Sequence, residues 1–184
     1  MELHRKINWS FVLLYFVVLL CSSFSNHENI LYKNILKKVK KEISKVFVLE
    51  DFELSPIQIQ PNEELIADFS GNRLLEISSN ETKLGYAYIG TAPSKTETFE
   101  YLVLFDNQFV IKKAKVLLYR ESWGGEIGSK RWLKQFLSKG TDYKFIYRQN
   151  ISAISGATIS VKSMTNAVNE LLSSLNFLIQ NKII

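Results

Sequence analysis

The sequence predicts an α+β domain, in which an antiparallel sheet of hairpins has flanking helices and a long C-terminal helix. Between residues 74 and 121, four segments rich in β-branched and aromatic side chains alternate with turn residues. On both sides of this region, apolar residues recur at helical spacing instead. A hydrophobic content of 46%, including 12% aromatic residues, is sufficient to build one core in a chain of 184 residues.

The predicted strands are residues 74–78, 84–90, 99–105 and 109–121. Turn residues at Asn80, Pro93-Ser94 and Asp106-Asn107 separate them, which is typical of antiparallel hairpins. The third turn lacks the glycine that tight hairpins usually carry. Two further short strands are predicted, IQIQ at residues 57–60 and YKFIY at residues 143–147.

Three helices are predicted. The first covers residues 28–47, where lysines alternate with apolar residues; a solvated lysine face is the simpler interpretation, and a face lying on an acidic membrane is the alternative. The second begins at the N-cap Ser129 and stops at Gly140. The third runs from Ile159, and its predicted apolar face comprises Val161, Met164, Val168, Leu171, Leu172, Leu175 and Leu178 or Ile179.

The first residues of the chain have the composition of a targeting segment. Basic residues at positions 4–6 precede the apolar run 7–20, and serines follow it, as in a secretory signal peptide. A membrane anchor over residues 7–24 and a lipid-modified Cys21 are the alternatives. All three predict a domain outside the cytoplasm. We expect it to be membrane-associated and to face the periplasm or cell exterior, or to be secreted or periplasmic after cleavage.

The predicted organisation is therefore a signal peptide or anchor at residues 1–25, an amphipathic helix and linker at 26–72, and one domain at 73–184. Cys21, His4 and His27 are the only cysteine and histidines, so the domain lacks both residue types. This excludes a disulfide framework, a Cys/His zinc site, a cysteine nucleophile and a histidine base there. Any redox chemistry must then reside on a cofactor. The net charge of +5 comes without a nucleic-acid-binding motif, so no nucleic-acid partner is expected.

Two short segments are candidates for a binding site. Ser155, Gly156, Ala157 and Thr158 precede the closing helix, where free amides and the helix dipole favour an anion such as phosphate. Capping of that helix by a serine or threonine side chain is the simpler alternative. The other segment, Gly124–Gly128, has three glycines that permit close approach to a flat ligand, and Trp123 and Trp132 flank it.

Together with GYAYIG (85–90), the segments YRESWGGEIGSKRWLKQF (119–136) and AISGATISVKSMTNAV (153–168) resemble the bacterial FMN-binding domain. The resemblance covers about residues 74–175. That domain also occurs in flavin-bearing subunits of the Rnf electron-transport complex and of sodium-pumping NADH:quinone reductase. The resemblance implies FMN as the cofactor, joined through a phosphoester to Thr158 by a magnesium-dependent flavin transferase that uses FAD and releases AMP. It also implies that Ser155, Gly156 and Ala157 adjoin the phosphate, and that Glu121, Gly124, Gly125, Glu126, Ile127 and Gly128 lie beside the flavin.

The function that this resemblance implies is electron relay by a carrier or subunit rather than by a stand-alone enzyme. Its expected partners are the transferase and redox proteins or a membrane electron-transport complex. One residue departs from the pattern: Ser152 stands where the transferase usually meets an acidic residue. This departure favours the alternative of a module that binds FMN or another phosphate ligand non-covalently without a redox role. A third hypothesis is an exported structural or adhesive domain without a cofactor.

Overall fold

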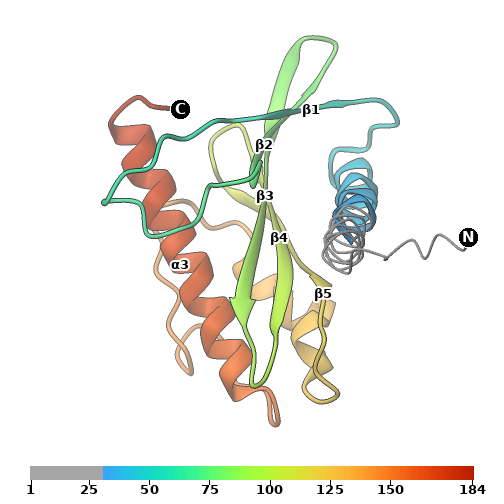
Figure 1. The fold of residues 1–184 in the computed structure, drawn as a ribbon, viewed down its shortest axis with the longest axis vertical. Coiled ribbons are helices and arrows are strands. Elements are labelled where there is room, and N and C mark those ends of the chain that lie inside the picture. The colour runs from blue at the N-terminus through green and yellow to red at the C-terminus, as the bar shows by residue number, and fades with distance from the viewer. Residues whose placement is uncertain (1–30) are drawn as a thin grey trace, which may run out of the picture. The chain divides into compact units, whose positions relative to one another are not determined.

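The computed structural model describes residues 31–184, and the predicted signal peptide or anchor lies outside them. Within the described residues, a helix covers 31–47 and a five-stranded sheet follows (Figure 1). Residues Val39–Ile184 form one compact unit, which contains the whole sheet and both candidate segments. The strands are β1 (Glu53–Pro56), β2 (Leu74–Ser79), β3 (Thr82–Pro93), β4 (Thr98–Asp106) and β5 (Ile111–Leu118). The helical elements after them are η1 (Gly125–Gly128), α2 (Lys130–Leu133), η2 (Lys134–Phe136) and α3 (Thr158–Gln180).

The sheet is an antiparallel meander, with its strands in the order of the sequence. The longest pairing joins β3 to β4, from Gly85 opposite Asp106 to Pro93 opposite Thr98. The prediction of an α+β fold with an antiparallel sheet of hairpins and a long C-terminal helix is confirmed. The division of the chain at residues 25 and 72 stays a prediction.

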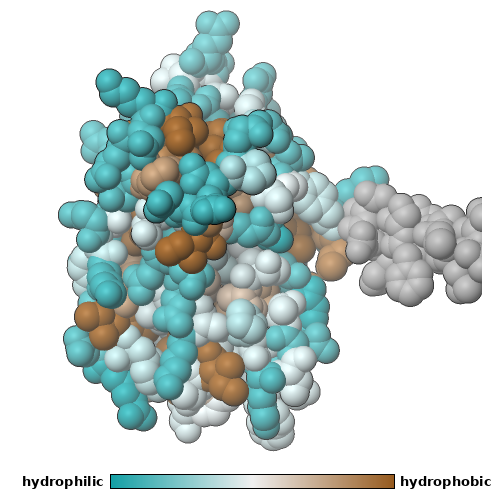
Figure 2. All heavy atoms as spheres, turned by 60° about the vertical axis from the view of Figure 1, so that its left-hand side comes forward, coloured by the Kyte–Doolittle hydropathy of each residue, from teal (hydrophilic) through white to brown (hydrophobic). Residues whose placement is uncertain are grey.

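The closing helix α3 packs against one face of the sheet (Figure 1). Its predicted apolar face is buried, with Val161, Val168 and Leu175 fully inaccessible to solvent. Figure 2 shows a largely hydrophilic surface with small, separate apolar patches on the side of the molecule that includes α3. Burial of one face of this helix is the largest single contribution that an element outside the sheet makes to the core. In residues 31–184, no helix has the length and apolar character needed to cross a membrane.

The turn between β4 and β5 forms without glycine because side-chain contacts stabilise it. The Asp106 carboxylate accepts hydrogen bonds from the amides of Gln108 (3.0 Å) and Val110 (2.9 Å). Phe109 adopts the left-handed conformation at φ 57°, and its ring stacks on Tyr86 with 4.1 Å between centroids. Aromatic stacking in the core therefore holds a backbone conformation that glycine would otherwise supply.

The predictions of short strands at residues 57–60 and 143–147 are wrong. Pro56 pairs with Leu75 next to the first residue of β2, so the chain after Ile57 has no strand residue left to pair with. In the second segment, the N–H and carbonyl of Phe145 are both hydrogen-bonded at 2.8 Å to the side-chain amide of Asn169 on α3. A helix side chain thus satisfies the backbone groups that a neighbouring strand would have paired.

The predicted helix from Ser129 to Gly140 is shorter than expected. Its start is confirmed, because the Ser129 hydroxyl accepts a hydrogen bond from the Trp132 amide at 3.3 Å. Its predicted stop at Gly140 is wrong, since the helical residues end at Phe136. The backbone then turns toward the sheet, and the amide of Ser138 donates to the carbonyl of Ile111 at 2.8 Å. Pairing with the start of β5 therefore ends the helix before the glycine is reached.

Candidate functional site

The first turn of α3 has no side-chain cap. The N-cap position is Ala157, with φ −124° and ψ 23°, and it offers no side-chain acceptor. No acceptor within residues 31–184 receives the amides of Thr158, Ile159 or Ser160. The prediction that a serine or threonine side chain caps this helix is therefore wrong. Three unpaired amides instead lie together at the positive end of a helix of 23 residues, a combination that favours an anion.

The hydroxyl groups beside these amides are available to a ligand. Ser155 and Thr158 are both exposed, and neither side chain makes a hydrogen bond within the described part of the chain. The next hydroxyl along the helix is engaged, because Ser160 is buried and lies 3.0 Å from the Tyr119 hydroxyl after β5. Ser163 donates to the carbonyl of Pro93 at the end of β3. The start of α3 is thus fixed to the sheet while Thr158 stays accessible.

The glycine-rich segment lies directly against the start of α3. Gly124 adopts φ 78°, and a Cβ built on it would lie 2.8 Å from the Cβ of Ala157 and 3.1 Å from the carbonyl oxygen of Gly156. Ile127 anchors the same segment, because its side chain is completely buried. The structure therefore brings together Gly124–Gly128 and Ser155–Thr158, which are about thirty residues apart in the sequence, with no room for a side chain between them.

A second contact holds the segment that precedes α3. The Trp132 indole Nε1 donates a hydrogen bond to the carbonyl of Ser152, and the Ser152 amide donates to the Gln135 side chain, both at 2.8 Å. The side chains of α2 and η2 thereby fix the backbone six residues before Thr158. A pocket of about 390 Å³ lies at this junction and is lined by Glu126, Ser129, Arg131, Trp132, Lys134, Gln135, Ser152, Ala153 and Ile154. Sequence reasoning missed this clamp, because indole and amide side chains carry no periodic signal.

The two tryptophans that flank the glycines differ in environment. Trp132 is buried in the core, where its ring meets Phe136 edge-on at 5.3 Å between centroids. Trp123 is 82% exposed. Only the first of these side chains therefore has the structural role that tryptophans usually have.

Glu121 lies at one end of the sheet, and its carboxylate is occupied by the turn between β3 and β4. It accepts hydrogen bonds from the amide of Thr96 (2.6 Å), the hydroxyls of Ser94 (2.8 Å) and Thr96 (3.0 Å), and the amide of Glu97 (3.2 Å). The Thr96 amide, followed by the Ser94 hydroxyl, lowers the pKa of Glu121 to about 2. In this arrangement the carboxylate acts as a brace for the turn, while Gly124 and its neighbours meet α3.

This brace gives a pH dependence that can be measured. A pKa lowered from 4.5 to about 2 means that the carboxylate stabilises the turn fully above about pH 4.5 and loses this effect as the pH falls to about 2. We expect the Thr96 amide resonance to titrate with a midpoint near pH 2, and Glu121→Gln to remove that titration. Glu126→Gln is the matched control and should leave it unchanged. A midpoint near pH 4.5 in the wild-type protein would show that the brace does not form.

The sequence that forms this site also matches a known protein family. Residues 95–173 match the family model of the FMN-binding domain. This segment is an FMN-binding domain. Its cofactor is FMN, and the matched residues include Glu121, Gly124–Gly128 and Ser155–Thr158. No curated protein matches the chain.

The residues of this FMN-binding domain fit the phosphate of FMN. The three free amides of α3 can donate hydrogen bonds to it, and Thr158 has an exposed hydroxyl beside them. No heavy atom lies within 4 Å of a Cβ built on Gly125 or Gly156, so the space beside both glycines is open. A bound flavin supplies the electron-accepting ring that the side chains of this domain do not provide.

Proposed function

We propose that this protein is an exported, membrane-associated electron carrier whose FMN is joined through its phosphate to the hydroxyl of Thr158. The observation that carries the proposal is the uncapped start of α3, where this exposed, unpartnered hydroxyl lies beside three free amides. A helix of this length would ordinarily gain stability from a polar N-cap side chain. An alanine at the N-cap leaves these donors to a phosphate instead.

Each neighbouring residue has a role in this proposal. The amides of Thr158, Ile159 and Ser160 hold the phosphate oxygens, and the open space beside Gly125 and Gly156 leaves room for the ligand to approach. The contact between Gly124 and Ala157 positions the glycine-rich segment next to the attachment point. The link from Ser160 to Tyr119 keeps the first turn of the helix fixed to the sheet.

Attachment requires a partner, because no histidine or cysteine is present after residue 27 to activate a threonine hydroxyl. In the proposed maturation, the Thr158 oxygen forms a bond to the phosphorus of the FMN half of FAD. The phosphoanhydride bond to AMP breaks, the hydroxyl proton passes to a base of the flavin transferase, and AMP leaves. No electrons are exchanged in this step. Export would follow from the basic and apolar residues at positions 4–20.

Non-covalent binding of FMN is the second candidate, and Ser152 favours it because this position lacks the expected carboxylate. Its backbone is nevertheless fixed on both sides by Trp132 and Gln135, so the segment that a transferase would meet is ordered by main-chain contacts.

Denaturation distinguishes the two candidates. Protein co-expressed with a flavin transferase should retain its flavin absorbance after unfolding in guanidinium and removal of small molecules by filtration. Under the second candidate, the flavin passes into the filtrate. Protein expressed without the transferase is the control, and it should release any flavin that it has bound.

A further inference from the structure

A second pocket lies between residues 39–47, β5 and α2, and it shares Lys134 with the pocket beside Ser152. Its volume is about 400 Å³. Its lining combines an apolar floor with charged walls and consists of Glu42, Lys45, Lys113, Ala114, Lys115, Gly128, Lys130, Leu133, Lys134 and Leu137. Five lysines and one glutamate give these walls an excess of four positive charges.

Three of these lysines surround the carboxylate of Glu42. Its side chain is only 6% exposed, and its carboxylate oxygens lie 2.7 Å from Lys115, 3.6 Å from Lys45 and 3.8 Å from Lys113. Burial alone would raise the pKa of Glu42, but the hydrogen bond and charge of Lys115, with the charges of Lys45 and Lys113, hold it below its ordinary value. One carboxylate balances one of these three ammonium groups, so two positive charges remain at this point.

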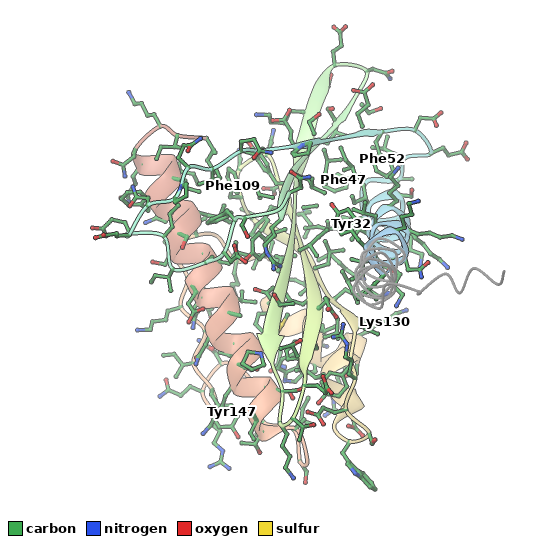
Figure 3. The ribbon with its side chains drawn as sticks, in the orientation of Figure 1. Tyr32, Phe47, Phe52, Phe109, Lys130 and Tyr147 are labelled. Carbon is green, nitrogen blue, oxygen red and sulfur yellow. The ribbon has the colours of Figure 1, made fainter. Side chains whose placement is uncertain are left out.

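Two more lysines add to the excess. Lys130 at the start of α2, which is labelled in Figure 3, and Lys134 at the start of η2 also line this pocket. Neither has an acidic partner among residues 31–184. Like charges gathered in a concave site repel one another and raise the local concentration of anions. This arrangement is costly for the folded protein alone and becomes favourable when an anion is bound.

From this arrangement we infer that the pocket is a binding site for a phosphate group that carries an apolar moiety. The phosphate would lie between Lys130, Lys134 and the three lysines that surround the Glu42 carboxylate. Ammonium groups donate strong hydrogen bonds to phosphate oxygens. The apolar moiety would lie on Ala114, Leu133 and Leu137. An anionic phospholipid and a soluble phosphate ester both have this chemistry. The site does not depend on flavin at Thr158.

Calorimetric titration of the full chain in a neutral detergent tests the inference. The probes are phenyl phosphate, a soluble ester with an apolar ring, and dihexanoyl phosphatidylglycerol, an anionic lipid; dihexanoyl phosphatidylcholine is the neutral-lipid control. We expect the double substitution Lys130→Gln/Lys134→Gln to lower the affinity for the probe about tenfold or more, because each lysine donates a charge-assisted hydrogen bond to the phosphate. The matched control is Lys112→Gln/Lys144→Gln, which removes two exposed lysines outside the pocket.

The outcomes are distinct. Tighter binding of phosphatidylglycerol than of phenyl phosphate, lost in the pocket variant, identifies a lipid headgroup site. Binding of phenyl phosphate alone, lost in the same variant, identifies a soluble phosphate ester site. Absence of binding by both probes, or binding that the pocket variant weakens no more than the control variant does, overturns the inference. Thr158→Ala should bind the probes as the wild type does, so loss of the proposed flavin attachment would not affect this result.

Discussion

Thr158→Ala is expected to reduce covalent flavin incorporation from near one flavin per chain to none when the protein is co-expressed with a flavin transferase. The reason is chemical, because alanine has no oxygen to form the phosphoester. The fold should be nearly unaffected, since the Thr158 side chain is exposed and makes no hydrogen bond with any described residue. The free energy of unfolding should change by less than about 0.5 kcal/mol, as is usual for surface substitutions. Flavin absorbance of the denatured protein measures the loading, and chemical denaturation measures the stability.

Ser155→Ala is the matched control for this prediction. Ser155 is another exposed, unpartnered hydroxyl in the same segment, three residues before Thr158. This variant should keep most of the covalent flavin, because it loses at most one hydrogen bond to the phosphate. If Thr158→Ala incorporated as much flavin as the wild type, or if only Ser155→Ala lost it, the attachment point would be wrong.

Gly124→Ala is expected to destabilise the domain by about 1–3 kcal/mol, because the substitution combines an unfavourable φ with overpacking. Gly124 adopts φ 78°, and the new Cβ would lie 2.8 Å from that of Ala157, so the glycine-rich segment and the start of α3 must separate. Flavin loading per folded molecule should fall as well, because these segments form the two sides of the site. Chemical denaturation and flavin absorbance of the folded fraction measure the two effects.

Gly125→Ala is the control for Gly124→Ala. The neighbouring glycine has no positive φ, and no heavy atom lies within 4 Å of a Cβ built on it. Its replacement should change the free energy of unfolding by no more than about 0.5 kcal/mol. Equal destabilisation by the two substitutions would mean that contact with Ala157 is not what requires glycine at position 124.

Periodicity was sufficient to predict the elements that bury a continuous apolar face. The strands of the meander and the closing helix belong to this group, because alternation or helical spacing is visible over many residues there. The predictions of short strands at 57–60 and 143–147 were wrong because these segments are too short to show such a pattern. Five residues such as YKFIY have a strand-like composition, but the partner of Phe145 is the side chain of Asn169 on a distant helix. Local sequence does not contain that information.

The candidate site was predicted through resemblance rather than through local physics. Serine and threonine near a helix start ordinarily cap it, and that simple expectation failed because the N-cap is Ala157. The contact of Gly124 with Ala157 could not be predicted from spacing, since it depends on how η1 and α3 meet in three dimensions. The hydrogen bonds of Glu121 could not be predicted from spacing either, because four of them come from the turn between β3 and β4. The position of Glu121 beside the flavin stays a prediction.

The most direct test of covalent attachment is the intact mass of wild-type protein purified after co-expression with a flavin transferase. We expect an added mass equal to FMN less one water, and fragmentation should place it on the peptide that contains Thr158. A mass without this addition, from protein that nevertheless binds FMN until it is denatured, would contradict covalent attachment and support the non-covalent alternative.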